Sequence, residues 1–336
     1  MDSSTSSSDQ DTRAPSLLVV STMLWRACGA TLLVALVIVG ATGALHRFRP
    51  AAVRPVSVEA LVVSAQLERL ATLPPTDILV LGDSSALMDV DPVALGEQLG
   101  HRRVESLAML AWVGPAGYGH VLERAATLRP PDDVLLLLNA VCLELDEKTY
   151  AATGFEQMVL GDYSAARYSA LRQLVSDARG GLFHDAIGRL VDFPLPGTFG
   201  KTYGDPDDLV AAIVRDHGGL IDPNHYKPDP KAYVFQLSQA TASRLPAMRD
   251  AITKAAPARL HFGVTPLPQS WLGPRTAESR RAVIAKVQRA LALPDSAVLD
   301  LPLAFPDDDF ATSTHLADSG RAVYTAVVAK ALAPEN

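Results

Sequence analysis

Residues 78–85 read Ile-Leu-Val-Leu-Gly-Asp-Ser-Ser, and this stretch decides the fold that the rest of the chain is expected to adopt. Four consecutive apolar residues are typical of a strand that is buried on both faces of a parallel sheet. The strand is expected to end at Gly82, a small polar cluster follows it, and a helical turn is expected to begin at residues 86–88. A serine at such a turn stands at the carboxyl end of the sheet, beside the free N–H groups of a helix N-terminus. The stretch therefore fits two roles: Ser84 is a nucleophile, or Asp83 or Ser84 only caps the helix.

The apolar segments that follow alternate with segments of helical periodicity. This alternation predicts an α/β domain at 74–333 with a doubly wound, parallel five-stranded sheet, in a flavodoxin-like three-layer sandwich. The expected strands after the first are 103–109, 134–138, 259–264 and 297–301, and the expected helices are 92–99, 120–128, 238–255, 276–291 and 319–332. Residues 149–240 break the pattern with helical stretches and long turn-rich segments, which predicts an α-helical insertion.

The first part of the chain differs from the rest in composition. Residues 1–26 begin with a Ser-, Asp- and Thr-rich segment that is expected to be a disordered tail. Residues 27–45 form a run of 19 residues without a charge, close to the roughly 20 that cross a bilayer, and predict a single transmembrane anchor. The alternatives are a buried core helix or a long leader cut near 42–44. The flanking charges give only a slight positive-inside bias, and that bias runs against export. Residues 46–73 are expected to be a linker and a lead-in helix.

Composition excludes several functional classes. The chain has 336 residues, enough for a sizeable core, and 48% of them are hydrophobic. A net charge of -7 provides no basic surplus to neutralise phosphates, so we expect no nucleic-acid partner. The 2 cysteines are too few for a disulfide framework or a cysteine metal cluster. The acidic run 307–309 is expected to be a solvated turn rather than a calcium site.

The Gly-Asp-Ser motif at 82–84, followed much later by a histidine just before the last helix, resembles the SGNH (GDSL-like) hydrolase superfamily. The resemblance implies that Ser84 is the nucleophile and His315 the general base. It also implies an oxyanion site formed by the Ser84 N–H, a glycine and an asparagine. Gly114 fits that glycine best, with Gly117 in reserve, and Asn139 fits the asparagine. The set requires no metal and no cofactor.

The chain departs from the family pattern in several blocks. The family usually has an aspartate three residues before the histidine, where this chain has Thr312. We expect Asp309, or alternatively Asp308, to replace that carboxylate. Ser106 stands where the second block usually has an asparagine, and residues 138–140 retain only the asparagine of the third block.

The resemblance and the anchor together predict a membrane-anchored serine esterase or O-acyltransferase, with its main domain outside the cytoplasm, in the periplasm or at the cell surface. The expected substrates are acylated glycans or small esters. The branch that acetylates exopolysaccharides would add a membrane-bound acyltransferase partner that supplies acyl groups. The alternatives are a catalytically degenerate relative that binds glycan or an assembly partner in a polysaccharide or cell-wall machine, and a signalling or transport accessory protein.

Overall fold

The computed structural model describes Trp25, Gly29 and residues 58–161 and 206–333. The chain divides into two units, Met1–Pro55 and Val56–Asn336, and the fold described below is that of the second. The predicted tail at 1–26 apart from Trp25, most of the predicted anchor at 27–45 and the centre of the predicted insertion lie outside the described residues. Within the described ranges, no helix is long and apolar enough to cross a membrane.

The second unit is built on a parallel sheet, which confirms the predicted α/β class. Its strands are β1 (Ile78–Gly82), β2 (Val104–Ser106), β3 (Asp133–Leu138) and β4 (Arg259–Val264), in the order β2-β1-β3-β4. Every residue of β1 and β3 is buried, as the apolar runs 78–81 and 134–138 predict. Two short parallel strands, β5 (Leu267–Pro268) and β6 (Ala304–Phe305), form a separate small sheet.

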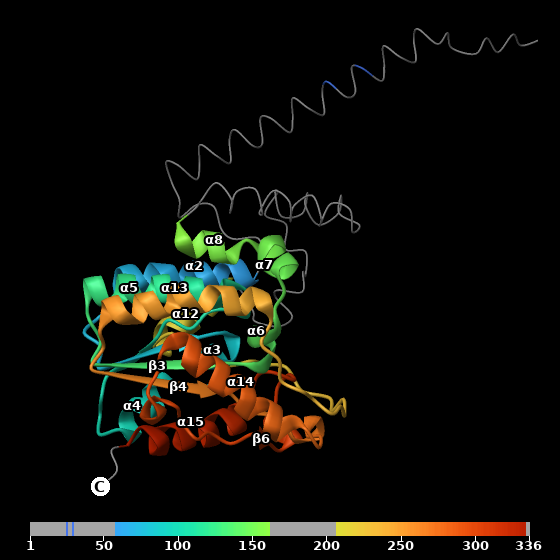
Figure 1. Ribbon diagram of the computed structural model, residues 1–336. Helices are drawn as coiled ribbons and strands as arrows, with labels where there is room; N and C mark the ends of the chain where they lie inside the picture. Colours follow the sequence, from blue (N-terminus) through green and yellow to red (C-terminus); the bar gives the residue numbers. More distant parts are fainter. Residues whose placement is uncertain (1–24, 26–28, 30–57, 162–205, 334–336) are drawn as a thin grey trace, which may run out of the picture. The chain divides into compact units, whose positions relative to one another are not determined.

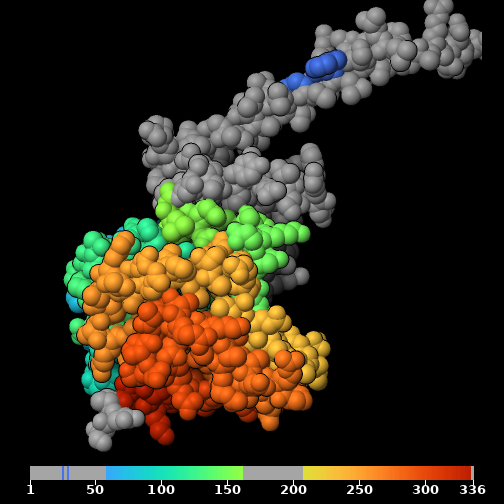
Figure 2. Space-filling model, in the orientation of Figure 1, coloured from blue at the N-terminus to red at the C-terminus, as the bar shows by residue number. Residues whose placement is uncertain are grey.

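Helices cover both faces of the main sheet. Figure 1 shows α2 (Val58–Ala71), α5 (Gly114–Leu128) and α13 (Gln239–Ala255) on one side, and α4 (Pro92–Gln98) and α15 (Asp318–Leu332) on the other. Figure 2 shows that residues from the C-terminal half, in orange and red, form most of the face turned toward the viewer. The other α-helices are α3 (Ser84–Asp89), α6 (Ala140–Glu144), α7 (Glu147–Thr153), α8 (Phe155–Leu160), α12 (Pro206–Arg215) and α14 (Thr276–Leu291), and the short 3-10 helices are η2 (Ala111–Val113), η3 (Gln269–Trp271), η4 (Asp295–Ala297) and η5 (Asp307–Asp309).

The predicted fifth strand at 297–301 does not join the main sheet as a strand. It contributes one isolated bridge to Phe262, in which the Leu299 N–H donates to the Phe262 carbonyl at 2.8 Å. The Leu301 N–H then turns back to the Leu299 carbonyl, and the Arg280 guanidinium donates to the Leu301 carbonyl at 2.9 Å. Because these bonds use the groups that a ladder would need, the pairing stops after one bridge.

The predicted insertion at 149–240 is described only in part. Most of α7 and all of α8 and α12 lie within it, and residues 219–238 carry neither helix nor strand. This extended segment runs from α12 to α13 and forms one border of the site described next. Its start is fixed to the sheet edge, because the Ser106 N–H donates to the His217 carbonyl at 2.8 Å.

Candidate active site

Ser84 is the first residue of α3, at the carboxyl end of β1. Gly82 has φ +144°, and a side chain there would collide with the Leu137 carbonyl, so the turn requires glycine. Asp83 is the N-cap: its carboxylate accepts the Ser85 N–H at 2.9 Å. Asp83, and not Ser84, is therefore the residue that caps α3. The Ser84 hydroxyl is partly exposed, and its N–H, in the first turn, has no partner to receive it within the helix.

His315 lies beside Ser84. Its Nε2 is 2.9 Å from Ser84 Oγ, although 231 positions separate the two residues. His315 stands in the short loop between η5 and α15, where an antiparallel bridge joins Phe310 to Leu316. The structure thus brings together the two residues for which the sequence predicted the nucleophile and base roles.

The carboxylate on the other side of the imidazole belongs to Asp222. Asp222 Oδ2 lies 2.6 Å from His315 Nδ1, and the Asp222 side chain is only 1% exposed. The other oxygen, Oδ1, accepts the backbone N–H of Asn224 at 3.0 Å and its side-chain amide at 2.6 Å. Burial acts to raise the pKa of Asp222, but the bonds from His315 and Asn224 outweigh burial and hold that pKa below its ordinary value. Asp222 therefore stays a carboxylate beside His315 Nδ1.

The sequence analysis expected Asp309, or alternatively Asp308, in this position, but the carboxylate bonded to His315 Nδ1 belongs to Asp222. Asp309 lies in η5 and packs against Gly320 at the start of α15, where its backbone carbonyl accepts the Ala317 N–H at 2.8 Å. The imidazole Nδ1 is instead bonded to Asp222, which lies in the segment that follows α12. The sequence 222–224, Asp-Pro-Asn, marks a turn, and a carboxylate in it was the available signal.

Thr312 stands where the family usually has the aspartate. Among the described residues, its side chain forms no hydrogen bond to the imidazole ring of His315. Its Oγ1 accepts the backbone N–H of His315 at 3.1 Å and that of Thr314 at 3.4 Å. Thr312 therefore shapes the loop, while Asp222 supplies the charge.

Asn139 ends β3 and is tied to the residue before Ser84. Its N–H donates to Asp83 Oδ2 at 2.6 Å, and its side-chain oxygen caps α6 by accepting the Val141 N–H at 2.8 Å. Asn139 Nδ2 donates to Thr265 Oγ1 at 3.1 Å, which uses one of its two hydrogens. Burial raises the pKa of Asp83, although the N–H groups of Asn139 and Ser85 act in the opposite direction. Asp83 thus joins the ends of β1 and β3 beneath the serine.

Gly114 starts α5, but its N–H donates to the Ala111 carbonyl and closes η2. The glycine is required for another reason: φ is +68°, ψ is 170°, and an added Cβ would lie 2.7 Å from the Tyr150 ring. Gly117, the reserve candidate, packs against the Val113 side chain. The Gly114 N–H is therefore already used within the chain.

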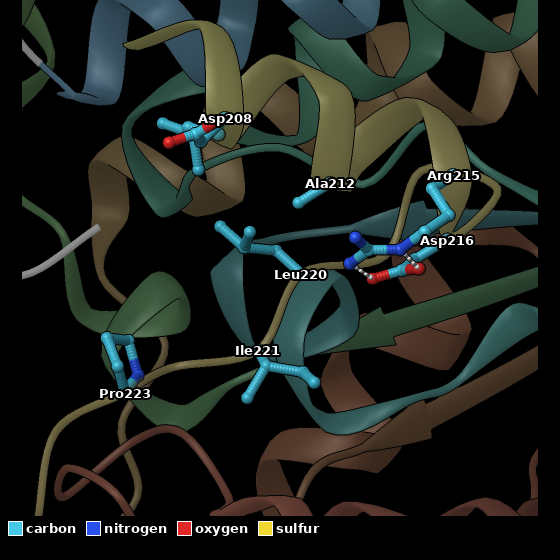
Figure 3. A pocket seen from close by; sticks show the side chains of 8 residues that line it. Asp208, Ala212, Arg215, Asp216, Leu220, Ile221 and Pro223 are labelled. Carbon is cyan, nitrogen blue, oxygen red and sulfur yellow. Dashed lines mark hydrogen bonds and ion pairs between the residues drawn. The ribbon is translucent and has the colours of Figure 1, made fainter. Parts of the chain in front are cut away.

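A pocket of about 220 Å³ lies between α12 and the residues around Asp222. Figure 3 shows Ala212 and Leu220 pointing into it, with the Arg215–Asp216 ion pair at one end. Ile221, on its wall, precedes Asp222, but neither Ser84 nor His315 lines it. This pocket is therefore not the place where a substrate would meet the serine.

Among the described residues, no group of three or more histidine, cysteine or acidic side chains converges in a way that would hold a metal ion. The acidic run 307–309 forms η5, where Asp307 accepts the Ser270 N–H at 2.9 Å.

Comparison with protein-family models and with curated protein sequences finds no match to this chain. The assignment of a function therefore depends on the geometry of the site.

Proposed function

We propose that this chain is an enzyme of the SGNH (GDSL-like) type, which forms an acyl-enzyme on Ser84. The observation that carries the proposal is the continuous line of hydrogen bonds from Ser84 Oγ through His315 to Asp222. A serine hydroxyl is a weak nucleophile unless a neighbouring base takes its proton, and the base must be oriented by a third group. The order of these three groups, and not any one of them, is what acyl transfer needs.

The proposed reaction begins when Ser84 Oγ attacks the carbonyl carbon of an ester and its proton passes to His315 Nε2. Asp222 stabilises the imidazolium, while the Ser84 N–H and Asn139 Nδ2 donate to the oxyanion. The tetrahedral intermediate collapses by breaking the bond to the leaving oxygen, which takes the proton from Nε2. An incoming hydroxyl then gives its proton to Nε2 and attacks the acyl carbon, and Ser84 leaves with the proton returned.

The acceptor hydroxyl decides between two names for the enzyme. Water as acceptor gives an esterase, and a sugar hydroxyl gives an O-acyltransferase. From the apolar run 27–45 and the family resemblance, we propose a membrane-anchored protein whose domain lies outside the cytoplasm and acts on acyl groups of envelope or exopolysaccharide glycans. A membrane-bound acyltransferase would then be its partner.

The test uses Ser84→Ala and wild type. Wild type should hydrolyse p-nitrophenyl acetate and should gain one adduct with a fluorophosphonate, located at Ser84 by mass spectrometry. Ser84→Ala should do neither, with an unchanged melting temperature. Undiminished labelling of Ser84→Ala would overturn the proposal. Transfer of the acetyl group to an added oligosaccharide, compared with release to water, would separate the two acceptors.

One observation favours a second candidate function, a binding protein without catalysis. The Gly114 N–H is used within η2, so the third oxyanion donor that the family resemblance implies is not available there. A degenerate site of this kind would bind an acylated glycan without turnover. Glycan binding by wild type, with no fluorophosphonate adduct over the full pH range of the folded protein, would favour this second candidate.

A further inference from the structure

The short helix α3 holds the chain on both sides of His315. Ser85 Oγ donates to the carbonyl of Thr314 at 2.7 Å, and Asp89 Oδ1 accepts the N–H of Leu316 at 2.7 Å. Ser85 and Asp89 are four residues apart, so they lie on the same face of α3. Both side chains are completely buried. The residues immediately before and after His315 are therefore each fixed to the helix that begins with Ser84.

Other hydrogen bonds around His315 have a different effect. The His315 N–H donates to Thr312 Oγ1, and the His315 carbonyl accepts the N–H groups of Ala311 at 2.9 Å and Thr312 at 3.2 Å. These bonds lie inside the loop and fix its shape. The two bonds to α3 instead fix the position of the loop relative to the nucleophile.

We propose that Ser85 and Asp89 are positioning residues that set the distance between Ser84 Oγ and His315 Nε2. This inference rests on the proposed function, because it gives the two residues a role in the reaction of Ser84. The requirement is strict: a displacement of about 1 Å between reacting groups can cost about 10²-fold in rate. Because α3 carries Ser84 and is hydrogen-bonded to the residues on both sides of His315, it holds the two side chains at a fixed distance.

The chemistry of Asp89 indicates that it acts as an acceptor rather than as a charge. Its second oxygen, Oδ2, is buried and has no hydrogen-bond partner among the described residues. Burial raises the pKa of Asp89 well above its ordinary value, and the Leu316 N–H offsets this only in part. An asparagine offers the same acceptor in the same shape. Asp89→Asn should therefore keep the loop in place, whereas Asp89→Ala should release it.

Thr325 provides a matched control. It is fully buried in α15, and its hydroxyl accepts the Asp91 N–H at 3.0 Å and donates to the Arg321 carbonyl at 2.8 Å, without a bond to the loop of His315. Thr325→Val removes a buried hydroxyl in the same part of the molecule. Thr325→Val should lower the melting temperature, and so should Ser85→Ala. Unlike Ser85→Ala, Thr325→Val should leave the reaction at Ser84 unchanged.

The experiment compares these full-length variants by their rate of fluorophosphonate labelling and by the downfield proton resonance of His315 Nδ1–H. We expect Ser85→Ala and Asp89→Ala to label about 10 to 10² times more slowly than wild type and to lose or shift the resonance. Asp89→Asn and Thr325→Val should stay within about threefold of wild type and keep the resonance. Asp89→Ala leaves the buried N–H of Leu316 unpaired and can fail to fold for that reason. In that case Ser85→Ala alone provides the test.

Two results would overturn the inference: labelling and resonance of Ser85→Ala that match those of Thr325→Val, or an Asp89→Asn variant as slow as Asp89→Ala. The resonance also separates this inference from the proposed function. If wild type does not react with the fluorophosphonate, the proposed function fails. An unchanged resonance in Ser85→Ala would then still overturn the positioning of the loop, whereas a lost one would support that positioning without a role in catalysis.

Discussion

At the scale of residues, the pairing of His315 with Asp222 changes the chemistry that the site offers. A histidine beside a threonine would have to hold its positive charge in the transition state without a partner. The Asp222 carboxylate removes that difficulty, because it is buried, receives two donors from Asn224 and faces Nδ1 at 2.6 Å. In the proposed reaction, the same bond would favour the tautomer with the proton on Nδ1, which leaves Nε2 able to accept the Ser84 proton.

The first prediction concerns this carboxylate. Asp222→Asn should lower kcat for p-nitrophenyl acetate by roughly 10³- to 10⁴-fold, because an amide neither stabilises the imidazolium nor selects the correct tautomer. Asp309→Asn is the matched control and should stay within about threefold of wild type. Steady-state kinetics of both variants provide the measurement. Equal losses in the two variants would contradict the assignment of Asp222.

A second prediction at this scale concerns Asn139. Asn139→Ala removes a proposed oxyanion donor and should lower kcat by about 10²- to 10³-fold, with a small effect on KM. It also removes the cap of α6, so the melting temperature should fall. Asp146→Ala, which removes the cap of the neighbouring helix α7 at its bond to the Thr149 N–H, is the control for lost capping alone. A loss of kcat no larger than that of Asp146→Ala would exclude Asn139 as an oxyanion donor.

At the scale of elements, the sequence predicted what local pattern determines and missed what folding brings together. The β1 and β3 strands and α14 follow from apolar runs and helical periodicity, and the structure places them at the predicted residues. The sequence analysis did not identify Asp222, because this residue lies in a segment without helix or strand, 93 positions before His315. No periodicity links the two residues. Their contact depends on the path of the whole segment between α12 and α13.

The fifth strand shows a similar limit. The apolar pattern at 297–301 is strand-like, but the bonds that stop its pairing come from Arg280, on a separate helix. Gly114 is a further example. The sequence predicted the helix at this point only over 120–128, whereas α5 begins at Gly114, and the structure shows that the Gly114 N–H is already used and that Tyr150 is the reason for the glycine.

The third prediction follows from the burial of Asp89 in α3. Because its pKa is raised in the folded state, folding takes up a proton above the unfolded value of about 3.9, so this group lowers stability as the pH rises. Asp89→Asn has no proton to take up. Asp83, Asp222, Arg321 and Tyr324 interact electrostatically with Asp89, and only the parts of their contributions that do not depend on the Asp89 charge cancel in the comparison. The stability of Asp89→Asn relative to wild type should therefore increase with pH.

Urea unfolding of both proteins at several pH values between 5 and 8 measures this difference. A difference that does not change with pH would mean that Asp89 is charged in the folded protein. The same titration tests the argument that the residue acts as an acceptor, because an ionised Asp89 would not be matched by asparagine.

At the scale of the whole molecule, the chain separates a described α/β unit from an N-terminal unit that ends at Pro55. All the residues of the candidate site, from Ser84 to His315, lie in the second unit. The proposed chemistry and the proposed membrane attachment are therefore assigned to different parts of the chain.

The last prediction uses this separation. The full chain should sediment with membranes, because 27–45 is a run without a charge and close to the roughly 20 residues of a span. A chain that begins at Val56 should stay in the supernatant and should label with fluorophosphonate at the rate of the full chain. If the domain lies outside the cytoplasm, protease added to intact spheroplasts should digest it in the full-length protein, with a cytoplasmic protein as the protected control. Protection of the domain would contradict its proposed location, whereas loss of labelling on truncation would contradict the assignment of the chemistry to the second unit alone.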